Sequence, residues 1–248
     1  MKNKTLAKNK YNKFITNIIN ITLVGMFVIS TKELVSSLEN IKIESYIEYF
    51  EKRMDFDTKQ VKIGKELFKK YNEISDYNYN MTLTSLNYLP EKLLVTLKNS
   101  GLDGVISEGS FISYSEDLGF DINVDERLNV SDKSIKACYM PSHHIFISAK
   151  LYDLLNFNLN LVHEIGHSYD YLKYSKTNNI LSQEDEFMNI YNSNEKENLF
   201  YYNDYYKKSE REYFAESFAL YYVNPTYLKE KAPRTYRYFE NILSIYNE

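Results

Sequence analysis

The chain contains no tryptophan and a single cysteine, Cys138, among its 248 residues. A lone cysteine excludes an intrachain disulfide, and it also excludes a zinc site built from several thiolates. Without tryptophan, aromatic stacking on a ligand falls to tyrosine and phenylalanine, of which the sequence has 25 and 14. That leaves the four histidines and the acidic residues as candidates for holding a metal ion.

Glycine and proline are also scarce, with 7 and 4 residues. No glycine- or proline-rich linker and no internal repeat divides the sequence, and 44% of its residues are hydrophobic, enough to bury a full core. The net charge of -4 provides no basic field, so nucleic acid is not expected as a partner. We expect one compact domain that acts as a monomer.

The amino-terminal segment has the pattern of a secretory signal. An uncharged run at residues 14–31 follows five lysines, namely Lys2, Lys4, Lys8, Lys10 and Lys13. A basic region before a short apolar stretch is typical of a signal peptide, and small side chains permit cleavage after Ser30. We therefore expect a signal peptide at residues 1–30 and a secreted, extracellular domain at residues 31–248. The alternative is an uncleaved anchor at the outer face of the cell, because the run is barely long enough to span a bilayer.

The segment His163-Glu164-Ile165-Gly166-His167 is the strongest functional signal. On a helix, residues four apart lie on one face, so both imidazoles can reach one metal ion. Glu164 would stand beside the water that such an ion holds. This H-E-x-x-H pattern is typical of zinc peptidases, in which the glutamate is the general base.

A catalytic zinc ion needs one more protein ligand and an open position for water. The extended pattern H-E-x-x-H-x-x-G-x-x-H fails, because Asp170 and Lys173 stand at its glycine and third-histidine positions. The helix expected at 209–222 instead offers Glu212 and Glu216 on one face. We assign Glu212 to the metal and Glu216 to a histidine ring N–H, and the reverse assignment and a surface pair of glutamates stay open. Asp170, one turn beyond the second histidine, is a further candidate to orient an imidazole.

The order of the elements predicts an α+β fold. Helical patterns cover residues 33–54, 58–74 and 91–99, β-type runs follow at 105–106, 111–114 and 144–147, and the pattern is helical again from residue 149. The strand at 144–148 is the one that we expect at the sheet edge, where it would pair with an extended substrate backbone. His143 and His144 are interpreted as exposed residues at the start of this strand.

Residues 121–132 begin with the D-x-N-x-D pattern of a calcium loop. Glu126 replaces the glycine at the sixth position, and Asp132 replaces the glutamate at the twelfth. Both departures favour a solvated acidic loop over a calcium site.

Three separated motifs, at residues 163–170, 212–218 and 232–236, resemble the catalytic domain of anthrax lethal factor and the secreted bacterial Pro-Pro endopeptidases. The resemblance extends from about residue 89 to the carboxyl terminus. It implies a zincin-like metalloprotease fold with a helical amino-terminal part, a small mixed sheet whose edge strand lies beside the motif helix, and a helical carboxyl-terminal lobe. It also implies one Zn²⁺ per chain, held by His163, His167 and the first glutamate of E-Y-F-A-E, which is Glu212.

The same resemblance assigns Tyr205, seven residues before Glu212, to a hydrogen bond with the oxyanion. Three further tyrosines, Tyr201, Tyr202 and Tyr206, crowd this segment, so an aromatic packing cluster is the competing interpretation. On a continuous helix, Tyr205 would project on the same side as Glu212.

The sequence therefore predicts a secreted zinc endopeptidase, with Glu164 as general base, that acts on protein or peptide substrates. The resemblance to the Pro-Pro endopeptidases adds proline-rich substrates and Pro-Pro bonds as candidates. Nothing in the residues near the motif fixes a preference for proline on both sides of the cut. Two alternatives stay open: a non-catalytic binding module with the same fold, and a zinc amidase that acts on cell-wall peptides.

Overall fold

The computed structural model describes residues 55–72, 74–109, 111, 114, 117, 137–140, 143–149, 159–172, 180–201 and 203–246, all within one compact unit, Phe50–Glu248. The predicted signal peptide, the helix expected at 33–54, the acidic loop at 121–132 and Tyr202 lie outside the described residues. None of the helices in the described ranges has the length and apolar character that crossing a membrane requires.

The amino-terminal part is helical. It contains α4 (Lys59–Leu67), α5 (Asp76–Leu83), the 3-10 helix η1 (Thr84–Tyr88) and α6 (Glu91–Asn99). The predicted helix at 91–99 is confirmed, and the chain leaves it through Gly101, whose φ of 95° suits glycine.

The predicted helix at 58–74 is wrong beyond Leu67, because the chain continues as the strand β1 (Phe68–Tyr71). The apolar spacing of this segment fits a short strand as well as a helix, and pairing with the sheet decides between them. Phe68 is fully buried, and its carbonyl oxygen accepts a hydrogen bond from the Tyr79 hydroxyl at 2.6 Å.

The sheet is small and mixed. Its strands β1, β2 (Asp103–Ser107), β3 (Ala137–Met140) and β4 (His144–Ser148) lie in the order β1-β2-β4-β3. The pairs β1/β2 and β2/β4 are parallel, whereas β3/β4 is antiparallel. The predicted edge strand is therefore wrong: β4 is interior, and in the described part of the sheet β3 is the edge strand next to it, with β1 at the opposite edge. The unbroken apolar run of β4 is what a strand buried on both faces needs.

Two further expectations fail around β4. Phe111 and Tyr114 are helical rather than extended, and their rings pack against Phe146 of β4 with centroid distances of 5.4 Å each. His143 lies in a turn with a φ of 60°, and its Nδ1 is 3.0 Å from the Tyr139 hydroxyl. His144 opens β4 with its Nδ1 2.6 Å from Asp103 Oδ1, so both histidines are half-buried and paired.

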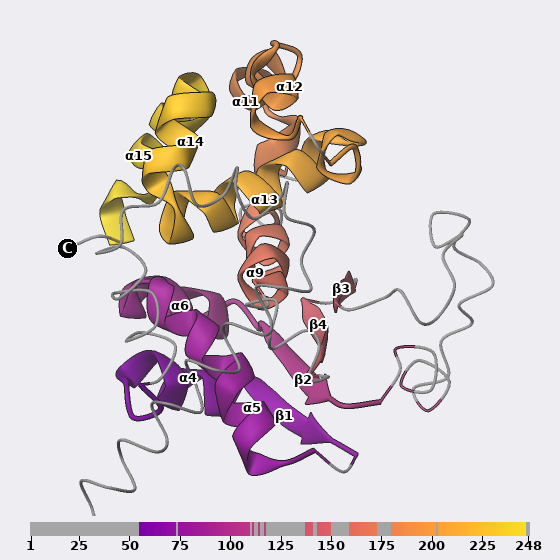
Figure 1. The fold of residues 1–248 in the computed structure, drawn as a ribbon. Coiled ribbons are helices and arrows are strands. Elements are labelled where there is room, and N and C mark those ends of the chain that lie inside the picture. Colours follow the sequence, from indigo (N-terminus) through magenta and orange to yellow (C-terminus); the bar gives the residue numbers. More distant parts are fainter. Residues whose placement is uncertain are drawn as a thin grey trace, which may run out of the picture. The chain divides into compact units, whose positions relative to one another are not determined.

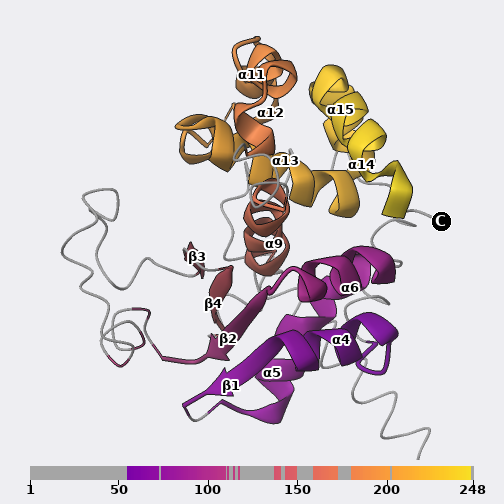
Figure 2. The ribbon, with the colours of Figure 1, turned by 180° about the vertical axis from the view of Figure 1, so that it is seen from behind.

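The carboxyl-terminal lobe is helical. It contains α9 (Asn160–Asp170), η5 (Leu181–Gln183), α11 (Asp185–Tyr191), α12 (Glu195–Leu199), η6 (Tyr205–Lys207), α13 (Glu210–Val223), α14 (Pro225–Lys231), α15 (Pro233–Leu243) and η7 (Ser244–Tyr246). Figure 1 and the reverse view in Figure 2 show α9 between the sheet and the other helices of this lobe. It contacts β3 and β4 on one side and α13 on the other. The predicted α+β class is confirmed.

The third sequence motif, at 232–236, belongs to this scaffold. The buried Glu195 carboxylate accepts hydrogen bonds from the backbone N–H groups of Arg234 and Thr235 at 2.9 Å each, and from the Thr235 hydroxyl. These N–H groups lie in the first turn of α15 and have no partners within the helix. The Thr235 hydroxyl is also 2.7 Å from that of Tyr213, so the motif fastens α15 to α12 and α13.

Candidate metal centre

The two histidines of the motif are held on a buried helix. Every residue of α9 from Leu161 to Asp170 is buried, and the exposed fractions of His163, Glu164 and His167 are 7%, 7% and 6%. Burial on this scale leaves the side chains little rotational freedom. It also removes the water that would otherwise solvate them, so each polar atom needs a partner.

The glutamates come from α13, which begins after Ser209. The Ser209 hydroxyl accepts a hydrogen bond from the backbone N–H of Glu212 at 3.2 Å, which caps the helix at the turn that carries this residue. Glu216 follows one turn later, and both carboxylates face α9.

Three side-chain atoms converge between the helices. Glu212 Oε2 is 3.3 Å from His163 Nε2, and Glu212 Oε1 is 3.6 Å from His167 Nε2. All three ligand atoms lie within 4.8 Å of one another, so one cation can contact them together. The structure thus brings His163, His167 and Glu212 into the arrangement of a three-residue metal site.

Glu216 occupies a different position. Its Oε2 is 2.8 Å from His163 Nδ1, so the imidazole donates its Nδ1 proton to Glu216. In the neutral form that binding a metal ion requires, His163 therefore presents an unprotonated Nε2 to Glu212. Glu212 Oε2 is buried and makes no hydrogen bond among the described residues. A lone pair and a carboxylate oxygen that face each other need a cation between them, and a nitrogen–nitrogen–oxygen donor set suits Zn²⁺.

The charges of the site also favour a bound cation. Burial by itself disfavours ionisation, but the Glu212 and Glu216 carboxylates outweigh it and raise the pKa of His163 to about 10. The two imidazoles likewise overcome burial and hold the pKa of Glu212 well below its usual range. Burial lowers the pKa of His167 to about 4. The site is therefore rich in negative charge and attracts a cation.

Glu164 lies beside β3, an edge strand of the described part of the sheet. Burial raises the pKa of its carboxyl group to about 7, and the adjacent His163 offsets part of this rise. A hydrogen bond with the backbone of Tyr139 also lowers it. Tyr139 belongs to β3, so the candidate base is next to the edge strand rather than in the interior of the lobe.

Tyr205 and Tyr206 are neighbours in the sequence, but their side chains have different surroundings. Tyr205 lies on η6, separate from α13, so the condition of a continuous helix is not met and helical spacing does not fix the direction of its side chain. Tyr205 is 50% exposed as a residue, but its hydroxyl end is withdrawn from water. This burial and the nearby Glu212 and Glu164 carboxyl groups raise the pKa of the hydroxyl, so it lies close to these two side chains. The Tyr206 ring instead packs 5.6 Å from that of His163 and 5.3 Å from that of Phe200.

Asp170 does not orient an imidazole. Its carboxylate accepts hydrogen bonds from the backbone N–H of Ser182 at 2.6 Å and from the Ser182 hydroxyl at 2.7 Å. It therefore fastens the end of α9 to η5. His167 Nδ1 is buried and has no hydrogen-bond partner among the described residues. The sequence carries no signal for Ser182, because a single serine outside the motifs has no distinctive spacing.

Gly166 lets the two helices approach closely. A Cβ atom at this position would lie 2.9 Å from both the Cα and the carbonyl oxygen of Ala215 on α13. Such distances are far below van der Waals contact, and the atoms that it would meet are backbone. Glycine at the second x-position of H-E-x-x-H is thus what allows α13 to bring Glu212 and Glu216 up to His163.

Replacing Gly166 with alanine should lower the free energy of unfolding by about 1–3 kcal/mol, the usual cost of overpacking. It should also weaken zinc binding, because the α13 backbone cannot yield without moving Glu212. Denaturant titration and zinc titration measure the two effects. Gly64→Ala is the matched control, since a Cβ there meets the side chains of Leu83 and Leu86 instead. Zinc affinity that is unchanged in Gly166→Ala would contradict the coupling.

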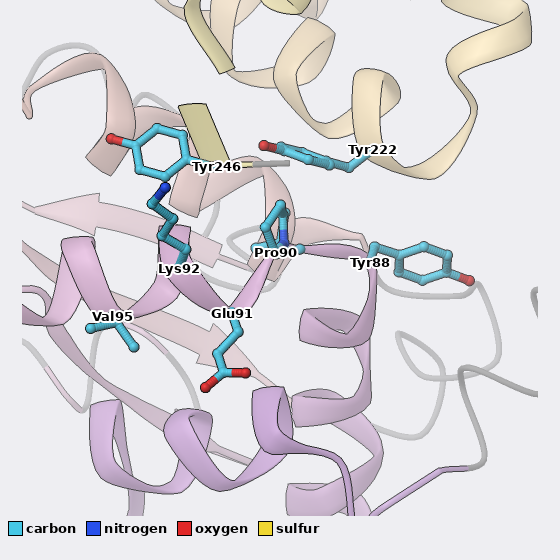
Figure 3. Close-up of a pocket in the computed structure, with 8 residues that line it drawn as sticks. Tyr88, Pro90, Glu91, Lys92, Val95, Tyr222 and Tyr246 are labelled. Carbon is cyan, nitrogen blue, oxygen red and sulfur yellow. The ribbon is translucent and has the colours of Figure 1, made fainter. Parts of the chain in front are cut away.

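A pocket of about 630 Å³ lies elsewhere, near the opposite end of α13 (Figure 3). Tyr88, Pro90, Tyr222 and Tyr246 border it, and none of the residues of the metal centre does. It is therefore separate from the site formed by α9 and α13.

A buried H-E-x-x-H helix, a glutamate from a later helix and an adjacent sheet edge together define the class of zincin-like metallopeptidases. The family described as anthrax toxin lethal factor, N- and C-terminal domain, matches residues 71–242, and the chain belongs to this family. Among solved structures, the Pro-Pro endopeptidase PPEP-2 from Paenibacillus alvei is similar, with a TM-score of 0.57 and 19% identity over 73% of this chain and 99% of that chain. No curated protein matches the chain. The family resemblance expected from the motifs is confirmed.

Proposed function

We propose that this protein is a zinc-dependent endopeptidase that hydrolyses bonds within peptide or protein substrates. The observation that carries the proposal is the convergence of His163, His167 and Glu212 beside the buried Glu164. Membership of the lethal factor family and the fold shared with PPEP-2 support a peptidase.

In this proposal each residue of the site has a separate task. His163, His167 and Glu212 hold the ion, and Glu216 fixes the His163 ring through its Nδ1 proton. When bound, Zn²⁺ supplies a Lewis acid that lowers the pKa of a water ligand towards about 7. Glu164 takes a proton from the attacking water and later delivers it to the leaving amine. The Tyr205 hydroxyl donates a hydrogen bond to the oxygen of the tetrahedral intermediate.

The outer edge of β3, which pairs with no other strand of the described residues, is the proposed binding surface for the substrate backbone. An extended peptide can add to an unpaired strand through main-chain hydrogen bonds. Because the Tyr139 backbone also contacts Glu164, a peptide on this edge would lie next to the base. We take Pro-Pro bonds as the first candidate substrate, since PPEP-2 is a Pro-Pro endopeptidase with the same fold.

Replacing Tyr205 with phenylalanine should lower kcat by about 10²–10³-fold, which is the usual effect of losing one oxyanion donor. Zinc affinity should change little, because the hydroxyl is not a ligand. Steady-state kinetics measure the loss of kcat, and zinc titration measures the affinity for the ion. Tyr201→Phe, at a tyrosine that is 72% exposed, serves as the control. If Tyr205→Phe keeps full kcat, the oxyanion role is excluded and the aromatic packing interpretation gains support.

The decisive experiment is mass-spectrometric profiling of the zinc-loaded protein with a peptide library centred on Pro-Pro. Cleavage that disappears after chelation and returns with Zn²⁺ supports the proposal. Bound zinc without cleavage of any peptide would indicate a non-catalytic module. Purified cell-wall peptides should be digested in parallel, because cleavage confined to them would indicate an amidase.

We further propose that residues 1–30 direct secretion and are removed, which makes the mature protein extracellular. The basic and then apolar pattern of the sequence supports this. Amino-terminal sequencing of protein recovered from the culture medium tests it. A chain that stays with the membrane and keeps its first residues would instead be an uncleaved anchor.

A further inference from the structure

Arg211 lies next to the metal centre and forms no ion pair with any carboxylate of the described residues. It immediately precedes Glu212 in the first turn of α13, and its Cζ lies 4.9 Å from the centroid of the Tyr171 ring. Its Nε is buried and has no hydrogen-bond partner, and no ion pair joins it to a carboxylate within the described ranges. A guanidinium group that is partly withdrawn from water is normally paired, so this one is available for a ligand.

Asp170, a buried acid on which the charge of Arg211 acts, does not fill this role. The pKa of Asp170 is raised by burial, lowered by the two hydrogen bonds from Ser182, and lowered further by the charge of Arg211. Arg211 is therefore close to Asp170, but both carboxylate oxygens already accept hydrogen bonds from Ser182.

Tyr139 connects this position to the sheet edge. Its ring centroid is 5.6 Å from that of Tyr171 and 6.1 Å from that of His167. Its backbone contacts Glu164, and Arg211 lies close enough to influence the Tyr139 hydroxyl. Tyr139, Tyr171 and Arg211 thus extend outward from the edge strand beside the metal centre. A peptide added to β3 would bring its side chains to this surface.

We propose that Arg211 is a specificity-determining residue that binds a carboxylate of the peptide substrate close to the scissile bond. This rests on the proposed peptidase function and adds a substrate class to it. A guanidinium group presents two parallel N–H donors that match the geometry of a carboxylate, and the Tyr171 ring would keep its plane fixed. The carboxylate can belong to an aspartate or glutamate side chain or to the carboxyl terminus of a short peptide.

The test compares substrates that differ only in this charge. One set of peptides has Asp or Asn at each position flanking the cleaved bond, which tests a side-chain carboxylate. A second set ends in a free acid or an amide, which tests the carboxyl terminus. In the native protein kcat/KM should favour the acid by about tenfold at one position, and in Arg211→Gln this ratio should fall to about one. Arg211→Lys should restore part of it. Arg237→Gln, at an exposed arginine on α15, should keep the native ratio.

A second measurement keeps the inference separate from the reaction. The dissociation constants of the same peptide pairs for the zinc-loaded Glu164→Ala protein report the preference without catalysis, so it can be tested even if no peptide is cleaved. No preference for the acid in the native protein or in this binding assay would overturn the inference. An equal loss for acid and neutral peptides in Arg211→Gln would also overturn it, because that result is expected if Arg211 only balances the charge of Asp170.

Discussion

Replacing Glu164 with alanine is expected to leave one Zn²⁺ bound per chain and to lower kcat for peptide hydrolysis by about 10²–10⁴-fold, the usual contribution of a general base. The carboxyl group is not among the three atoms that converge on the ion, so metal binding does not depend on it. Its burial and its pKa of about 7 instead suit a group that exchanges a proton near neutral pH. Steady-state kinetics and metal analysis of the same sample measure the two results.

Two further variants complete this test. Glu164→Gln keeps the shape of the side chain but cannot accept the proton, so it should lose as much activity as the alanine variant. Glu240→Ala removes an exposed carboxylate on α15 and should keep native kcat. Undiminished turnover in Glu164→Ala would end the proposed mechanism.

Replacing Glu212 with alanine is expected to have the largest effect on metal binding, because it removes one of three ligands and leaves the two imidazoles alone. Zinc affinity should fall by more than about 100-fold, beyond the 10–100-fold that removal of a residue behind a ligand usually costs. Glu216→Ala should show that smaller loss, since Glu216 contacts His163 only through Nδ1. Competition with a chromophoric chelator measures both affinities.

The ranking of these two variants decides between the assignments that the sequence left open. If Glu216→Ala loses more zinc than Glu212→Ala, Glu216 is the ligand and the roles are exchanged. The Glu210→Ala variant is a suitable control, because Glu210 lies on the same turn as Glu212 but bonds to Gln183.

The parts of the site that follow from helical spacing were predictable from the sequence. Four-residue spacing places His163 with His167, and Glu212 with Glu216, on single helix faces, and the structure contains both helices. Which face of α13 meets α9 depends on packing, and the close contact at Gly166 that sets it has no counterpart in a motif.

The features that depend on contacts between distant segments were not predictable. The strand order places β3 outside β4, so the apolar run of β4 indicated a strand but not its position in the sheet. The strand β1 exists because β2 pairs with it, although its residues also fit the end of a helix. Asp170 pairs with Ser182 across a connection that no spacing rule relates to α9.

The metal centre joins two helices that the chain itself does not connect directly. An ion held by α9 and α13 would act as a removable crosslink in a protein whose only thiol cannot form an internal covalent bridge. Ligands that bind only the folded state raise its stability by mass action. Binding of the catalytic ion would then also raise the free energy of unfolding of the carboxyl-terminal lobe. The form without metal would be both inactive and easier to unfold.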